Sequence, residues 1–239
     1  LKKLNENLTA TVATKYGYTR QIKIKDSTRK GGVPSTTQYG ILMDEISKEI
    51  QKADLGIKIE GMPEKIGSLL WVDDVFIATT IDKEMQDSLD ITNDKSNQYH
   101  IEYGAPKSNI QLIKLNRKRN EMPSFKLGDT TLEQTDKYKY LGLIQNSKNN
   151  NDDHFSAIKG KLEAAYQKIL KLAGDADFSN IEMEVFWKLL ESCIIPIITY
   201  GGEAWETKKE DYKKANSMYE NIIKRILKVP QGTPGRHST

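Results

Sequence analysis

The sequence predicts an α+β protein whose first part mixes strands with helices and whose second part is entirely helical. Short apolar or alternating segments are interleaved with helical periodicity over residues 1–145. A polar run at residues 146–151 interrupts this pattern, and beyond it the apolar residues keep helical spacing as far as position 227. We therefore expect one domain at 1–145, a second at 146–230 and a flexible tail at 231–239.

The first half of the chain alternates helices with short strands. Apolar residues at positions 1, 4, 8 and 12 have helical spacing and predict a helix that ends at Gly17. Alternation over residues 20–25 predicts a strand. Apolar spacing over residues 34–53 predicts a second helix, which Gly56 terminates.

An apolar run at residues 69–78 is interrupted only by two acidic residues. This pattern predicts two strands joined at the acidic pair, and a helix that reaches Tyr99 follows them. Shorter apolar stretches near 110–115, 125–127 and 138–143 predict further strands around a glycine turn.

Three helices are expected in the second half, over about 155–172, 181–198 and 212–227. We expect the middle one to bend at Pro196, because proline lacks the N–H of a regular helical turn. Trp187 and Trp205 are expected in the core of this bundle rather than as platforms for stacked bases.

Composition excludes several classes of protein. The single cysteine, Cys193, argues against a disulfide framework or a cysteine-rich zinc site, and it is expected to be a buried thiol in a reducing intracellular compartment. We find no apolar run of the roughly 18 residues that a membrane span needs, and we expect no membrane partner. The chain begins at Leu1 without a signal-peptide core, and we expect it to be a fragment.

The net charge of +3 is unevenly distributed. Residues 1–30 and 95–148 are net basic, residues 31–94 are net acidic, and residues 149–239 are neutral. An acidic block between basic ones suits metal-binding carboxylates set among phosphate-binding surfaces. Ordinary solvated charge explains the distribution equally well.

The acidic pair Asp73-Asp74 is the sharpest chemical feature of the sequence. Burying unpaired carboxylates costs several kcal/mol, so the pair needs a turn, a partner or a metal ion. A purely structural two-residue turn favours Asn-Gly or Asp-Gly, whereas two carboxylates supply the oxygen ligands that Mg²⁺ prefers. The sequence therefore predicts a magnesium site here, with a solvated turn as the alternative.

Residues 71–74 resemble the aromatic-X-Asp-Asp box of reverse transcriptases, in particular those of non-LTR (LINE-type) retrotransposons. Five further segments resemble motifs of this family in the same order. They are a glycine box at 29–36, the helix after it at 39–46, a lysine-bearing segment at 107–108, a Tyr-Leu-Gly primer grip at 138–142 and a Tyr-Gly-x-Glu-x-Trp thumb motif at 196–205.

The resemblance implies a partial palm at 1–145, an antiparallel sheet with helices on one face that lacks the first catalytic strand and most of the fingers. It also implies a helical thumb at 146–230. It implies an RNA-directed DNA polymerase, a nucleotidyltransferase that extends a DNA primer on an RNA template with dNTPs and two Mg²⁺ ions. It also implies a nuclear location. Lysines of the thumb, among them Lys159, Lys161 and Lys168, would follow the backbone of the bound duplex.

The resemblance also assigns roles to individual residues. Asp73 and Asp74 would be the catalytic metal ligands. The residues that would bind the nucleotide and template are Lys30, Gly31, Gly32 and Lys107. Those that would position the primer are Trp71, Val72, Tyr140, Leu141 and Gly142.

Each role has a simpler alternative. Lys107 and the thumb lysines could be solvated, Gly31-Gly32 could be an ordinary turn, and Tyr140-Leu141 could be strand core. The sequence also departs from the family: Lys30 replaces a glutamine, Thr36 replaces a proline, and a further catalytic aspartate is not found upstream. We therefore expect this chain alone to be incomplete or inactive, either as a decayed element or as part of an intact one. A non-catalytic nucleic-acid-binding remnant and a helical interaction module at 151–239 are the alternative functions.

Overall fold

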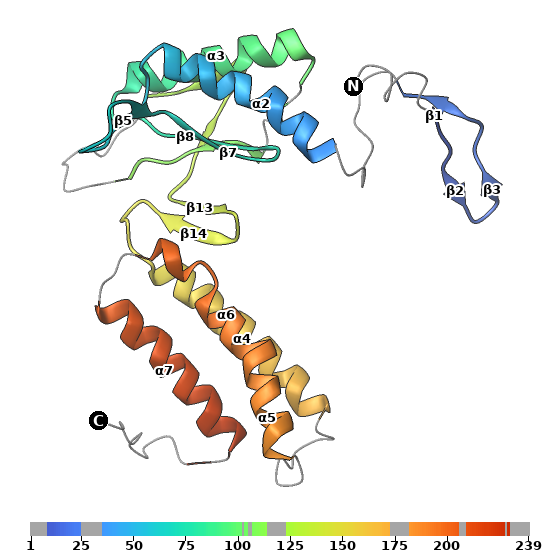
Figure 1. Ribbon diagram of the computed structural model, residues 1–239, viewed down its shortest axis with the longest axis vertical. Coiled ribbons are helices and arrows are strands. Elements are labelled where there is room, and N and C mark those ends of the chain that lie inside the picture. The colour runs from blue at the N-terminus through green and yellow to red at the C-terminus, as the bar shows by residue number, and fades with distance from the viewer. Residues whose placement is uncertain are drawn as a thin grey trace. The chain divides into compact units, whose positions relative to one another are not determined.

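The computed structural model describes residues 9–24, 35–101, 103–104, 107–113, 123–172, 182–205, 209–227 and 229. Contacts divide the chain into a first unit, residues 1–108 and 123–133, and a second unit, residues 109–122 and 134–239. Figure 1 shows their elements. The hairpin before the C-terminal helices belongs to the second unit, whereas the sequence places the domain boundary at the end of this hairpin, between 145 and 146; that boundary stays a prediction.

The first unit begins with a two-stranded ribbon. Its strands are β1 (Thr9–Ala10), β2 (Ala13–Thr14), β3 (Gly17–Tyr18) and β4 (Ile22–Lys23), and β1 pairs with β4 and β2 with β3, both antiparallel. The strand predicted over 20–25 is confirmed at β4.

The predicted first helix is wrong where the structure describes it, and residues 1–8 lie outside the described residues. β-branched threonines and Val12 favour extended backbone over helix. The turn is fixed by Thr14, whose hydroxyl accepts a hydrogen bond from the Tyr16 N–H (3.2 Å) and donates one to the Gly17 carbonyl (2.8 Å). Gly17 has a φ of 122°, which a side chain would oppose.

Helix α2 (Ser35–Lys52) packs on the hairpin of β7 (Ser68–Trp71) and β8 (Asp74–Ile77). Met43, Ile46 and Ile50 on α2 are fully buried at the helical spacing that predicted them. They form a core with side chains of the hairpin, and the Ser47 and Ser68 hydroxyls are hydrogen-bonded at 2.8 Å. The predicted helix and both predicted strands are thus confirmed.

The rest of the first unit surrounds this core. It comprises β5 (Ile57–Lys58), β6 (Lys65–Ile66), helix α3 (Asp82–Tyr99), β10 (Lys126–Leu127) and β11 (Thr130–Thr131). Helix α3 packs on α2 with small hydroxyl side chains, and Ser88 and Thr92 each donate to the carbonyl four residues earlier at 2.7 Å. The turn predicted between β10 and β11 is confirmed.

The second unit joins short strands to a helical bundle. Its strands are β9 (Asn109–Ile110), β12 (Glu133–Gln134), β13 (Lys137–Tyr140) and β14 (Leu143–Asn146). Gln134 of β12 is the first residue of the unit's second segment. Its helices are α4 (Asp152–Leu172), α5 (Met183–Leu189), η3 (Leu190–Ile194), α6 (Ile195–Thr199), η4 (Gly202–Ala204) and α7 (Lys209–Ile226). Strands β13 and β14 form an antiparallel hairpin before α4.

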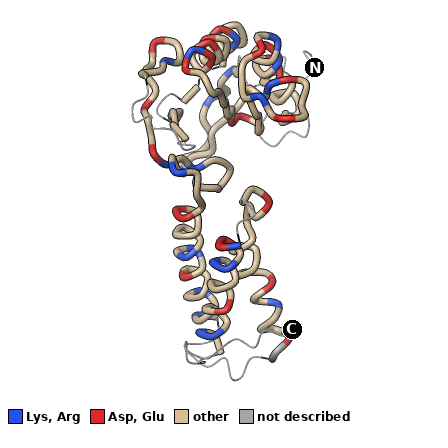
Figure 2. The backbone as a smooth tube through the Cα atoms, turned by 90° about the vertical axis from the view of Figure 1, so that its left-hand side faces the viewer, with Lys and Arg blue, Asp and Glu red and all other residues tan. Residues whose placement is uncertain are grey.

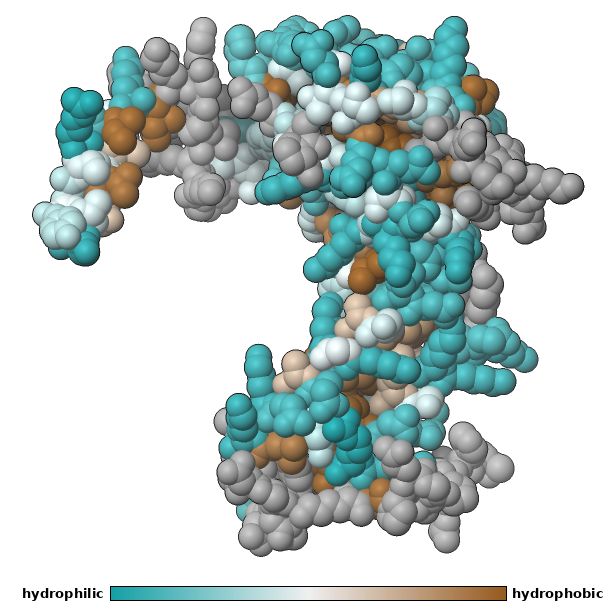
Figure 3. Space-filling view, turned by 180° about the vertical axis from the view of Figure 1, so that it is seen from behind, coloured by the Kyte–Doolittle hydropathy of each residue, from teal (hydrophilic) through white to brown (hydrophobic). Residues whose placement is uncertain are grey.

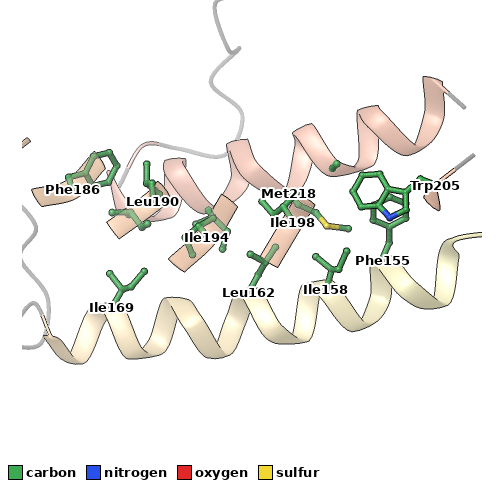
Figure 4. Close-up of a cluster of buried hydrophobic side chains, with 13 residues drawn as sticks. Phe155, Ile158, Leu162, Ile169, Phe186, Leu190, Ile194, Ile198, Trp205 and Met218 are labelled. Carbon is green, nitrogen blue, oxygen red and sulfur yellow. The ribbon is translucent and has the colours of Figure 1, made fainter. Parts of the chain in front are cut away.

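The core of the bundle is a continuous row of apolar side chains from α4, the α5–α6 segment and α7 (Figure 4). The Trp205 indole is buried and packs against Phe155 in a tilted arrangement with ring centroids 5.1 Å apart, so its predicted core position is confirmed. Trp187 is 47% exposed, and its predicted core position is wrong. Cys193 is only partly buried.

The middle helical segment changes its hydrogen-bonding pattern where the sequence predicts a bend. A π-helical turn, η3, lies directly before Pro196, which occupies the first turn of α6. A π-turn displaces the backbone register, and a proline accompanies such irregularities because it has no N–H to donate. By length and composition, Glu184–Ala204 could also cross a membrane, although Leu190, Ile194 and Ile198 within it belong to the bundle core.

The structure therefore confirms a protein of helices and small antiparallel sheets. The described residues form two-stranded sheets only, rather than the single palm sheet that the resemblance implies.

Candidate functional site

The β7–β8 hairpin carries the acidic pair at its tip. Trp71 pairs with Asp74, so Val72 and Asp73 form the two-residue turn, one position earlier than the predicted bend at the acidic pair. Val72 has a φ of 57°, a conformation that branching at Cβ strongly disfavours. Strained residues of this kind persist where surrounding structure holds them, and they cluster at functional sites.

The side chains of the tip face solvent. Asp73 and Asp74 are exposed, Trp71 is 62% exposed and Val72 is 42% exposed. Exposed carboxylates can serve as oxygen ligands for a divalent cation such as Mg²⁺. Within the described ranges, no group of three or more His, Cys, Asp or Glu side chains could hold a metal ion. Mg²⁺ is commonly held by one or two carboxylates together with water and substrate phosphates.

Helix α2 brings a second element close to the tip. Burial, and after it the negative charge of Asp73, raise the pKa of the Tyr39 hydroxyl above its usual value. Tyr39 also packs against the core that α2 shares with the hairpin. The segments predicted at 39–46 and 71–74 are therefore neighbours in the first unit.

Three of the predicted nucleotide-binding residues, Lys30, Gly31 and Gly32, lie outside the described residues. Lys107 lies in a short helical turn, where its N–H donates to the Gly104 carbonyl at 2.7 Å, and its side chain is exposed. The predicted role of Lys107 on a leaving pyrophosphate stays a prediction.

The second predicted cluster, Tyr140-Leu141-Gly142, forms the turn of the β13–β14 hairpin. Tyr140 pairs with Leu143, so Leu141 and Gly142 are the turn residues. Their φ values are 46° and 86°, and positive φ at both central residues is typical of a tight turn that matches strand twist. Glycine suits this position, whereas Leu141 needs support from its surroundings.

Tyr200 supplies that support. Its hydroxyl donates a hydrogen bond to the Leu141 carbonyl at 2.6 Å. A Cβ on Gly142 would lie 2.8 Å from the Tyr200 ring, and a Cβ on Gly201, whose φ is 72°, would lie 2.2 Å from the Leu143 side chain. Each segment thus has a glycine where the other places a side chain. The two segments, 59 residues apart, are interlocked.

The interlock was missed at the level of individual residues. Tyr200 opens the motif at 200–205 that resembles a thumb segment, yet the motif does not reveal what the ring contacts. Positive φ at an apolar residue also leaves no signal in sequence. Local residue spacing does not reveal a contact between residues 59 positions apart in the sequence.

His154 lies near the backbone of Tyr200 and is 2% exposed. Burial lowers the pKa of His154; the backbone carbonyl of Tyr200 opposes this shift, and the charge of Lys161 adds to it. His154 and the buried Trp205 Nε1 make no regular hydrogen bond with the described residues. Both line a cavity of about 100 Å³ with Asn146, Asn150 and neighbouring residues.

The lysines predicted to follow a duplex lie on α4. Lys159, Lys161 and Lys168 are exposed. Acidic and basic residues are interspersed along the helices of the second unit (Figure 2), and Glu163 on α4 makes a bidentate pair with Arg225 on α7 at 2.6 and 3.1 Å. The Lys161 ammonium lies 5.7 Å from the centroid of the Tyr200 ring. The predicted contacts of these lysines with a duplex stay predictions.

Comparison of the sequence with protein-family models and with curated proteins gives no match in either case. The resemblance to reverse transcriptases therefore depends on the ordered motifs of the chain.

Proposed function

We propose that the chain is part of an RNA-directed DNA polymerase of the non-LTR retrotransposon type. The observation that carries this proposal is the β7–β8 hairpin, which presents two adjacent exposed carboxylates after an aromatic residue at a strained two-residue turn. A rigid tip of this kind would hold Mg²⁺ where a primer 3′-hydroxyl attacks a dNTP on an RNA template.

The proposal gives each carboxylate a distinct position. Asp73 lies in the turn and would be the main ligand, whereas Asp74 is the first residue of β8 and would ligate less directly. Their oxygens and the non-bridging phosphate oxygens of the dNTP would share the metal ions. Trp71, Val72 and the turn at 140–142 would position the primer end. The first unit would be palm and the helices of the second unit thumb.

The direct test is metal binding by the chain itself. We expect Mn²⁺, a paramagnetic substitute for Mg²⁺, to broaden the amide NMR signals of residues near 71–74. Asp73→Ala should remove this broadening. The matched control is Asp129→Ala, in the exposed turn between β10 and β11, and it should leave the broadening intact. Equal broadening in wild type and Asp73→Ala would refute the proposed ligand.

Catalysis is tested in the protein that carries this chain. Primer extension on an RNA template should need Mg²⁺ and fall at least a hundredfold in Asp73→Ala. Retained extension would overturn the assignment of Asp73.

A non-catalytic nucleic-acid-binding remnant is the second candidate. The departures at Lys30 and Thr36 from the family's glycine box favour it. In that case RNA affinity should fall with salt, and Asp73→Ala should change neither affinity nor any metal response. Metal-dependent primer extension by the chain would exclude this candidate.

A further inference from the structure

The N-terminal ribbon, residues 9–24, offers a surface that the proposed polymerase chemistry does not use. Only Ala10 and Ile24 in it are partly buried, and every other residue is exposed. Tyr16 is 87% exposed and Tyr18 is 80% exposed. A two-stranded hairpin on its own is marginally stable in water, and exposed aromatic side chains on it indicate an interaction surface.

The strand register shows that the ribbon carries one extra residue. Ala13 opposes Tyr18, and Ala10 opposes Ile22. Two residues separate the alanines, whereas three separate Tyr18 from Ile22. The second strand therefore contains a β-bulge, which restores the alternation of side chains with a shift of one position.

The bulge gathers the large polar side chains on one face. Tyr18 and Arg20 are two residues apart and share a face of the strand. Beyond the bulge, Lys23 opposes Thr9, which lies on the same face of the first strand as Ala13, the partner of Tyr18. Opposite Tyr18 and Lys23 the first strand has only small residues, so this face is open to a ligand.

The charge of the ribbon has one sign. Lys15, Arg20 and Lys23 lie in residues 9–24, and this segment contains no Asp or Glu. The Lys15 ammonium lies 4.8 Å from the centroid of the Tyr16 ring at the turn. The two aromatic rings, Tyr16 and Tyr18, lie between the cations Lys15 and Arg20 along the chain. The ribbon shows hydrophilic and apolar side chains together at its surface (Figure 3).

We propose that this ribbon binds a single strand of nucleic acid, with bases stacked on Tyr16 and Tyr18 and phosphates held by Lys15, Arg20 and Lys23. An exposed ring can stack on an unpaired base, whereas bases within a duplex are already stacked on one another. The absence of acidic residues from the ribbon favours a polyanion over an acidic-and-basic protein surface. The proposal does not rest on the metal chemistry at Asp73.

The first test is fluorescence anisotropy of a labelled oligo(U) RNA of about 12 nucleotides with the full chain. Replacing Tyr16 and Tyr18 together with alanine should weaken binding about tenfold or more. Replacing both with phenylalanine keeps the rings and should change affinity less than threefold. Tyr212→Ala, which removes a tyrosine that is 56% exposed on α7, is the matched control and should have no effect.

Circular dichroism and thermal melting establish that the alanine variant is folded. Unchanged affinity in the folded alanine variant overturns the proposal. An equal loss in the phenylalanine variant also overturns it, because stacking does not need the hydroxyl.

The second test measures how affinity depends on salt. Replacing Lys15, Arg20 and Lys23 with glutamine should reduce the slope of log K against log salt by about 2, since each phosphate contact on a single strand contributes about 0.7. An unchanged slope overturns the proposal, as does tighter binding of a duplex of the same length. If the ribbon instead mediates self-association, the alanine variant will change the molar mass in light scattering but not RNA affinity, and that result also overturns it.

These tests are separable from the polymerase proposal. Oligo(U) affinity is measured in EDTA, so the proposed metal site at Asp73 cannot contribute to it. Loss of metal binding with intact ribbon binding would reject only the polymerase site, and the reverse result would reject only the ribbon.

Discussion

The hairpins β7–β8 in the first unit and β13–β14 in the second are both built from four-residue strands, but their turns are supported differently. Each has a two-residue turn with an apolar residue at positive φ, Val72 at 57° and Leu141 at 46°. Leu141 is held by a hydrogen bond from Tyr200, and Gly142 fits under the same ring. At the first turn, Val72 and Asp73 are both exposed.

The two turns differ in what holds the residue with positive φ. The second turn is fixed by a distant part of its own chain, so its backbone has a defined position before any ligand arrives. The first turn presents two exposed carboxylates, and no side chain comparable to Tyr200 is seen to hold it in the described residues. The two turns therefore differ in how their positive φ is supported.

The largest expected effect concerns the interlock. Gly201→Ala should destabilise the second unit by about 2–4 kcal/mol, because a methyl group would clash with Leu143 and alanine disfavours positive φ. Chemical denaturation followed by tryptophan fluorescence measures this change. Gly160→Ala on α4 is the control, since nothing lies within 4 Å of its added Cβ, and it should stabilise by up to about 1 kcal/mol. Equal effects of the two substitutions would show that the turns are not interlocked.

The second prediction concerns pH and His154. Burial lowers the pKa of His154, so the folded state favours the neutral ring. The stability that the neutral His154 ring contributes should be fully present above the unfolded pKa of about 6.5. As the pH falls from this value to the folded pKa, that contribution should be lost with a slope of at most about 1.4 kcal/mol per pH unit. His154→Gln should remove this slope, and the exposed His100→Gln should retain it. If the slope remains in His154→Gln, the pH dependence of stability arises from another group.

The third prediction isolates the hydrogen bond at the second turn. Tyr200→Phe keeps the ring against Gly142 but leaves the Leu141 carbonyl without its donor, and it should cost about 1 kcal/mol. Hydrogen exchange of the Leu141 and Gly142 amides should also quicken. Tyr212→Phe provides the comparison at an exposed site. If neither stability nor exchange changes, the hydroxyl does not hold the turn.

The smallest effect is expected at the first turn. Val72→Gly relieves positive φ but adds flexibility to the unfolded chain, so stability of the first unit should rise by no more than about 1 kcal/mol. Melting of the first unit, followed by Trp71 fluorescence, measures it. Ile41→Gly is the reference at an exposed helical residue of the same unit and should destabilise. A clear loss of stability in Val72→Gly would mean that the valine side chain itself supports the turn.

Sequence periodicity predicted the helices well because their apolar faces repeat at local spacing. Met43, Ile46 and Ile50 are buried on one face of α2, and Ile158 and Leu162 on one face of α4. The same reasoning misled at residues 9–17, because the helix was predicted from apolar residues at 1, 4, 8 and 12, whereas the threonines of 9–17 favour extended backbone. The Asp73 hairpin was predicted from its two apolar flanks, but its register was displaced by one residue, since flanking strands do not determine which residue adopts positive φ.

The candidate site was predicted only as far as local pattern extends. Trp71, Asp73 and Asp74 share one tip, as adjacent residues on a hairpin must. Tertiary packing brings Tyr39 close enough to Asp73 for its charge to act on the Tyr39 hydroxyl. It also brings Tyr200 to Leu141, and local spacing in the sequence specifies neither approach. The same is true of the exposed face of the ribbon, which depends on a bulge.

The interlock between the 141–142 turn and Tyr200 has a consequence for biosynthesis. The hairpin emerges from the ribosome 59 residues before the tyrosine that secures its turn. Until that tyrosine has left the exit tunnel, Leu141 has no donor for its carbonyl, and the nascent turn is free to adopt other conformations. A translation pause between these two points would lengthen the time during which chaperones can reach the unfinished hairpin.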